Sequence, residues 1–97
     1  LPLGGEKAVN ACDKILKDYS KHHGIAVEGI SGAELYEIAK DKLKETSFPD
    51  NVINLIDETM AGAKLNRQTS VCKNDFDSTL LRLLGADIIS IRIGFQG

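Results

Sequence analysis

The stretch from Ser47 to Ala61, SFPDNVINLIDETMA, decides the fold of this chain. Pro49 suits the first position of a helix, where no backbone N–H is needed, and Asp50 brings negative charge to the first turn, where the helix dipole favours it. Apolar side chains then recur at helical spacing, which predicts an amphipathic helix from Pro49 to about Lys64. The expected buried stripe consists of Val52, Ile53, Ile56, Met60 and Ala63.

Two further helices are predicted before this stretch. The first runs from Glu6 to His23 and is ended by Gly24, because glycine readily takes the conformation that follows a last helical turn. The second begins at the capping box that Ser31 forms with Glu34, and it runs to about Glu45. The chain up to residue 46 is therefore expected to be largely helical.

A last helix and two short strands complete the predicted fold. The helix is expected from Asp75 to Leu84, with Gly85 ending it. Residues 25–27 are apolar and partly β-branched, and residues 69–72 can form a second short strand that pairs with them. The sequence thus predicts a mainly α fold of four helices with a minimal two-stranded ribbon.

Composition narrows the classes of protein to which the chain can belong. Its 97 residues suffice for one domain, and 12 basic against 14 acidic residues, a net charge of −2, lack the basic excess of nucleic-acid-binding proteins. No apolar run approaches the roughly 20 residues that span a bilayer, and the first residues, LPLGG, do not resemble a signal peptide. Cys12 and Cys72 have no metal-ligand spacing and are expected to be reduced, buried thiols of an intracellular protein. We expect neither nucleic acid nor a membrane as a partner.

Three segments are expected along the chain. Residues 1–5 form a flexible N-terminal segment, residues 6–85 the helical domain, and residues 86–97 a linker toward a following module. The last segment, ADIISIRIGFQG, is too apolar for a free tail. It is expected to pack on this domain or against a neighbour.

The stretch from Ser47 to Ala61 also resembles a family signature. It is similar to the Leu-Pro-Asp-Lys-Ala-Ile-Asp-Leu-Ile-Asp-Glu-Ala string of Clp-type AAA+ protein unfoldases, which lies in the small helical lid of their first ATPase module. Residues 17–25, KDYSKHHGI, resemble the family's Lys-Tyr-Glu-x-His-His-Gly-Val, and residues 70–76, SVCKNDF, resemble its Thr-Val-x-x-x-Asp-Ile. The resemblance covers roughly residues 6–90 and implies a four-helix AAA+ lid.

The resemblance also implies a function. In the family the lid closes over ATP or ADP held by a large AAA+ subdomain, of the same or a neighbouring subunit, in a homo-oligomeric ring in the cytoplasm or an organelle matrix. Its motion drives unfolding by a chaperone or disaggregase, which acts alone or with an adaptor or a peptidase in proteolysis. By resemblance, Pro49, Asp50 and Ile53 are nearest the nucleotide. A helix N-terminus favours anionic ligands and Ile53 can pack on a base, although the same three residues can equally serve only to cap and pack the helix.

No residue of this chain is expected to be catalytic by itself. It has neither a Gly-x-x-x-x-Gly-Lys-Ser/Thr phosphate loop nor an acidic Walker B strand, so the isolated chain is expected neither to hydrolyse ATP nor to hold a cofactor. His22 and His23 point apart on a helix and lack a third metal ligand. Asp57 and Glu58 do not face each other, which favours a solvated face or a salt bridge over acid–base chemistry, and Cys12 has no matching histidine for a nucleophile's role.

Departures from the family pattern keep an alternative open. Asn51 stands where the family has lysine, Asn54 stands where it has aspartate, and the arginine and proline of the family's linker are not clearly present. The two asparagines favour a stand-alone protein-interaction adaptor with a degenerate AAA+ lid fold. The apolar residues from Ile88 to Phe95 favour the lid of a larger ATPase, because they require a neighbour.

Overall fold

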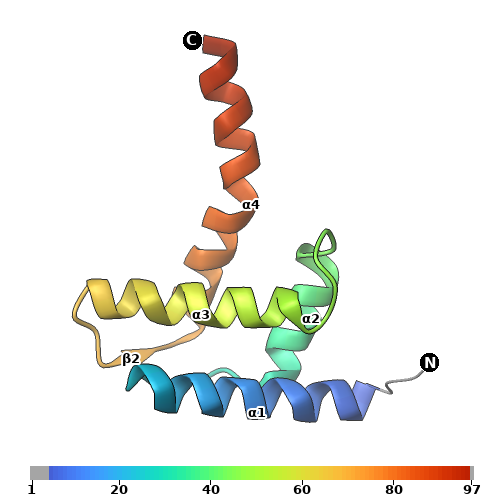
Figure 1. Cartoon of the computed structure of the whole chain (residues 1–97), viewed down its shortest axis with the longest axis vertical. Helices are drawn as coiled ribbons and strands as arrows, with labels where there is room; N and C mark the ends of the chain where they lie inside the picture. Colours follow the sequence, from blue (N-terminus) through green and yellow to red (C-terminus); the bar gives the residue numbers. More distant parts are fainter. Residues whose placement is uncertain (1–4, 97) are drawn as a thin grey trace.

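The computed structural model describes the backbone of residues 5–96 and the side chains of residues 5–85. This part of the chain folds into four helices and two short strands (Figure 1). The predicted mainly α architecture with a two-stranded ribbon is confirmed. In chain order the elements are α1 (Gly5–His23), β1 (Ala26–Val27), α2 (Gly32–Lys42), α3 (Asp50–Leu65), β2 (Ser70–Val71) and α4 (Lys73–Gln96).

The helices pack around one aliphatic core. Figure 1 shows α1 and α3 alongside each other, α2 crossing at one end, and α4 extending away from the other three helices. Phe76 is the one aromatic residue among the largest fully buried side chains of residues 5–85, and it lies at the start of α4. The aliphatic side chains around it include Leu35, Val52, Leu55, Ile56, Met60 and Val71.

The two strands are parallel, with Ala26 opposite Ser70. The Ala26 N–H donates to the Thr69 carbonyl at 2.9 Å, and the Glu28 N–H donates to the Val71 carbonyl at 2.8 Å. The predicted pairing of residues 25–27 with residues 69–72 is therefore confirmed. The ribbon ties the end of α1 to the start of α4, and α2 and α3 form the connection between its strands.

Helix α3 confirms most of the predicted stripe and widens it. Val52, Ile56, Met60 and Ala63 are buried as predicted, whereas Ile53 is only half-buried. A second buried row on the same helix was not predicted, because two of its three members are polar and do not count in an apolar pattern. That row consists of Asn51, Leu55 and Thr59.

Two predicted helix ends are wrong. Helix α2 ends at Lys42 rather than about Glu45, since the Leu43 N–H makes the last helical hydrogen bond, to the Ala39 carbonyl. Helix α4 passes through Gly85 and continues to Gln96. A glycine ends a helix where it takes a left-handed conformation, as Gly24 does with a φ of +70°, whereas a glycine that stays helical costs only about 1 kcal/mol.

The predicted segments at the two ends of the domain are described only in part. Helix α1 begins at Gly5, the last residue of the predicted N-terminal segment, and residues 1–4 lie outside the described residues. At the other end the backbone of residues 86–96 is helical. That this segment links the domain to a following module stays a prediction.

Candidate functional site

The three residues predicted to lie nearest a nucleotide sit together at the start of α3. Pro49 occupies the N-cap position, one residue before the predicted one, and its side chain is exposed. Asp50 is exposed in the first turn, and Ile53 is half-buried. All three can therefore meet a ligand or another domain, but none of them lines either of the two hollows beside the α2–α3 turn.

Most backbone N–H groups at the start of α3 already donate hydrogen bonds within the protein. The Asn51 N–H donates to the Ser47 carbonyl at 3.1 Å, and the Ile53 N–H donates to the Pro49 carbonyl at 3.0 Å. Between them, the Val52 N–H donates to the side-chain oxygen of Asn51 at 2.7 Å. An anion that approaches this helix end would thus meet the helix dipole and side chains rather than the N–H groups of these three residues.

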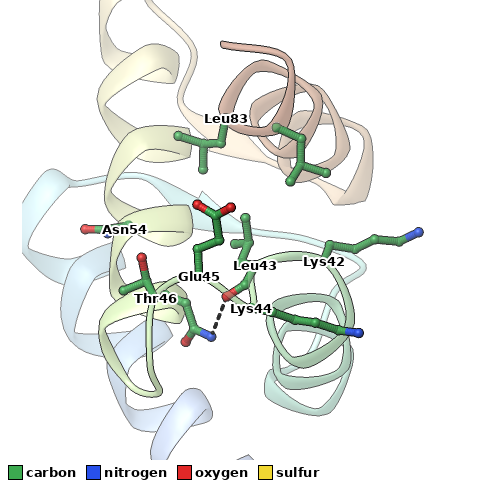
Figure 2. Close-up of a pocket in the computed structure, with 9 residues that line it drawn as sticks. Lys42, Leu43, Lys44, Glu45, Thr46, Asn54 and Leu83 are labelled. Atoms are coloured by element: carbon green, nitrogen blue, oxygen red, sulfur yellow. Dashed lines mark hydrogen bonds between the residues drawn. The ribbon is translucent and has the colours of Figure 1, made fainter. Parts of the chain in front are cut away.

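A hollow of about 480 Å³ lies between the α2–α3 turn and α4, and we call it the leucine pocket. Its apolar wall consists of Leu43, Leu83 and Leu84. Figure 2 shows Glu45 reaching toward Leu83 from the turn, while the side chain of Lys42 extends outward. Lys44, Thr46, Asn51 and Asn54 complete the lining.

A second hollow of about 320 Å³, the aromatic pocket, lies on the other side of the same turn. The rings of Tyr36 and Phe48 meet edge to face there, with 5.7 Å between their centroids and 87° between their planes. The Lys40 Nζ lies 5.9 Å from the centroid of the Tyr36 ring, within the range of a cation–π contact. Lys44, Thr46 and Asn51 line this pocket as well as the leucine pocket.

Asn51 holds the wall between the two pockets in place. Its side chain is only 6% exposed, and its Nδ2 donates to the Leu43 carbonyl at 3.2 Å and to the Ala39 carbonyl at 3.5 Å. It thereby binds the last carbonyls of α2 to the first turn of α3. In the sequence, Asn51 stands out only as a departure from a family pattern. Its spacing of four and eight residues from Leu55 and Thr59, on a helix face next to the apolar stripe, is the signal that indicates burial.

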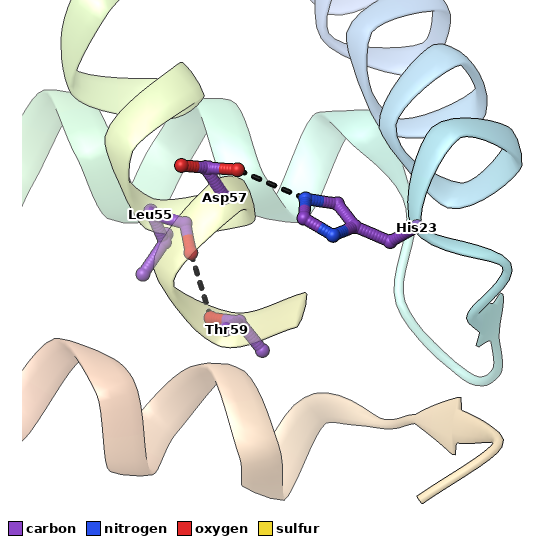
Figure 3. A network of polar contacts seen from close by, with 4 residues as sticks. All are labelled: His23, Leu55, Asp57 and Thr59. Atoms are coloured by element: carbon purple, nitrogen blue, oxygen red, sulfur yellow. Dashed lines mark hydrogen bonds and ion pairs between the residues drawn. The ribbon is translucent and has the colours of Figure 1, made fainter. Parts of the chain in front are cut away.

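A polar contact joins α1 to α3, 34 residues apart in sequence (Figure 3). The His23 Nε2 lies 2.9 Å from the Asp57 Oδ1, and the two side chains are 13% and 48% exposed. Thr59, two residues after Asp57 on the same helix, is buried and donates to the Leu55 carbonyl at 2.7 Å. Of the two roles predicted for Asp57, a solvated face or a salt bridge, this contact fits the second when His23 is protonated. In the part of the chain that the structure describes, no three side chains of metal-ligating type gather together.

Cys12 is fully buried and has an unreactive environment. Burial raises the pKa of its thiol from the usual 9.0 to about 11, and the negative charge of Asp13 adds to the shift. A thiol with this pKa has very little of the nucleophilic thiolate form at neutral pH. Cys12 therefore belongs to the core, while Cys72 is half-buried at the start of α4; both are free thiols.

We expect the two thiols to differ sharply in reactivity. At pH 8 the native protein should react with one equivalent of a disulfide reagent such as DTNB at Cys72, and Cys12 should react only after unfolding.

The buried Cys12 thiol should also make the stability of the protein depend on alkaline pH. Because the folded pKa of Cys12 lies above its usual value, the stability that its protonated form contributes is complete below pH 9 and is lost as the pH rises toward 11. Cys12→Ala should weaken this alkaline loss of stability. In the DTNB experiment, two equivalents of the reagent reacting with the native protein at equal rates would contradict the expected difference between the two thiols.

The chain matches the model of a known protein family. The model of a family described as AAA lid domain matches residues 5–84 of the chain. Neither a curated protein nor a solved structure matches it significantly. Among the described helices, none combines the length and the apolar character that crossing a membrane requires.

Proposed function

The chain belongs to the AAA lid domain family, and from this premise we propose that it is the lid of a Clp-type ATP-dependent protein unfoldase. A lid domain is not the catalytic ATPase domain, so hydrolysis requires a large AAA+ subdomain that this chain does not supply. In the proposal the lid closes over ATP or ADP held there and transmits its motion to the next subunit of a homo-oligomeric ring. The parent protein would work in the cytoplasm or an organelle matrix, alone or with an adaptor or a peptidase.

The observation that carries the Clp assignment is the string from Ser47 to Ala61. It covers most of α3 and the three residues before that helix. The family match supports an AAA lid, and this string supports the finer assignment. Pro49, Asp50 and Ile53 are accessible at the start of that helix, as a nucleotide contact requires. The free donors there are few, so we propose that contact is made by the Ile53 side chain and the helix dipole rather than by a cradle of N–H groups.

Mechanical transmission requires a lid that moves as one body, and three contacts between helices support it. The Asp13 carboxylate accepts a hydrogen bond from the Gly32 N–H at 2.8 Å, which joins α1 to α2. The Asn51 side chain joins α2 to α3, and the pair of His23 with Asp57 joins α3 back to α1. The three helices thus close a ring of tertiary contacts.

The adaptor alternative loses one of its two supporting residues. Asn51 has a structural role in holding α2 to α3, so its presence requires no loss of nucleotide contact. Asn54 is exposed, and it remains the one substitution that favours a free-standing adaptor.

The size of the native polypeptide separates the two functions. An antibody against this chain should detect, in a lysate of the source cells, a band many times larger than 10.5 kDa. The purified large protein should then hydrolyse ATP, and Ile53→Asp should raise its KM for ATP at least fivefold, while Glu58→Gln on the same helix should not. A native band at 10.5 kDa would reject the lid function in favour of the adaptor.

A further inference from the structure

The leucine pocket and the aromatic pocket share one wall but differ in chemistry. Lys44, Thr46 and Asn51 border both, so a single ligand that crosses the α2–α3 turn can occupy both hollows. At about 480 Å³ and 320 Å³, each falls within the size range of sites that bind small ligands or side chains. One hollow is walled by aliphatic side chains and the other by two aromatic rings.

Charge is distributed unequally between the two hollows. Lys40 and Lys44 line the aromatic pocket, and no acidic side chain lines it. The leucine pocket also has two lysines, but Glu45 lines it and reaches toward Leu83 (Figure 2). A ligand carboxylate is therefore attracted more strongly to the aromatic pocket than to the leucine pocket, where the negative charge of Glu45 offsets one of the two lysines.

Apolar surface continues from the leucine pocket onto α4. Leu83 is half-buried, Leu84 is 37% exposed, and Leu81 is 71% exposed nearby on the same helix. Leu81 and Leu84 are two of the three large apolar side chains most exposed among residues 5–85. Covering them with an aliphatic side chain removes apolar area from water, which is favourable by about 25 cal/mol per Å².

We propose that these two pockets together dock a polypeptide segment of another protein, in which aliphatic side chains are followed after a short spacer by carboxylates. The aliphatic part fills the leucine pocket against Leu83 and Leu84, and the carboxylates lie at Lys40 and Lys44 over the aromatic pocket. This docking does not depend on ATP or on the proposed lid function. It defines a surface by which the domain recognises an acidic partner segment.

The test uses a synthetic peptide with two leucines, one glycine and three glutamates, titrated into the ¹⁵N-labelled chain by NMR. We expect the amide signals of residues 43–48 and of residues 83–84 to shift together. A peptide with lysines in place of the glutamates, and one with alanines in place of the leucines, should each bind at least about fivefold more weakly. Equal binding of either control peptide would overturn the proposal.

Matched charge reversals on the protein locate the site. Lys44→Glu should weaken binding about tenfold, and it should not affect folding because Lys44 is exposed. Lys17→Glu, an equal charge change at an exposed position of α1 that borders neither pocket, should leave the affinity within about twofold. Equal weakening by both variants would overturn the proposal. Shifts of the same amides by ADP, with none caused by the acidic peptide, would assign this surface to a nucleotide and would also overturn it.

Discussion

Replacing Gly32 with alanine is expected to lower the free energy of unfolding by about 2–3 kcal/mol, because helices α1 and α2 touch at this position. An alanine Cβ at Gly32 would lie only 2.7 Å from the backbone nitrogen of Asp13, and it would overlap the Asp13 carboxylate. The helices must then separate, which also breaks the hydrogen bond from the Gly32 N–H to Asp13. Urea denaturation followed by circular dichroism measures the change.

Gly62→Ala is the matched control for this prediction. Gly62 also lies in a helix, but the nearest atom that an added Cβ would meet is the Arg82 Nη2 at 3.8 Å, an ordinary contact distance. Alanine is the better helix former by roughly 1 kcal/mol, so this variant should be stabilised rather than destabilised. If both variants shifted stability in the same direction, close contact between α1 and α2 would not be the cause of the loss at Gly32.

Asn51→Leu is expected to lower the free energy of unfolding by about 2 kcal/mol. The substitution removes the side-chain amide that donates to the part-buried Leu43 carbonyl. Asn51→Asp should cost more at pH 7, since a carboxylate would face the carbonyl oxygens of Leu43 and Ala39. The pKa of that introduced carboxyl is raised above its unfolded value, so its penalty grows as the pH rises from 4 to 7. Denaturant curves of both variants at pH 4 and pH 7 measure these effects.

Asn54→Leu provides the control on the same helix. Asn54 is exposed, and the change should leave stability within about 0.5 kcal/mol at both pH values. If Asn51→Asp lowered the free energy of unfolding equally at pH 4 and pH 7, the Asn51 amide would not face the two carbonyls in solution. Hydrogen exchange should also accelerate in residues 43–50 of the Asn51 variants and not in the Asn54 variant.

Local signals in the sequence predicted the helices and the two strands. The apolar stripe of α3, the glycine after α1 and the N-cap of α2 each act over a few residues. The structure confirms the glycine, which has a positive φ, and the stripe except for Ile53, which is half-buried. Of the predicted capping box it shows the bond from the Glu34 N–H to the Ser31 Oγ at 3.4 Å. The local prediction was wrong at Gly85, because the conformation of one glycine depends on the residues after it as well as on its own freedom.

Contacts between distant positions could not be predicted in the same way. The bond between Asp13 and Gly32 and the pair of His23 with Asp57 join residues that no periodicity connects. The two pockets arise from the α2–α3 turn, whose course depends on the buried amide of Asn51. A pattern of apolar residues shows which helix face is buried, and it leaves open which polar side chain crosses to a neighbouring helix.

The parallel direction of the β1–β2 ribbon determines how this domain responds to a pulling force. The chain enters β1 from α1 and leaves β2 into α4, so tension between those helices pulls the two parallel strands from opposite ends. In this shear geometry the hydrogen bonds of Ala26 and Glu28 share the load, whereas strands pulled from the same end open one bond at a time. The ribbon, together with the packing of α1 and α4 on α3, shields the covalent α2–α3 connection from this tension. The two hydrogen-bonded strands therefore act as a mechanical clamp between α1 and α4.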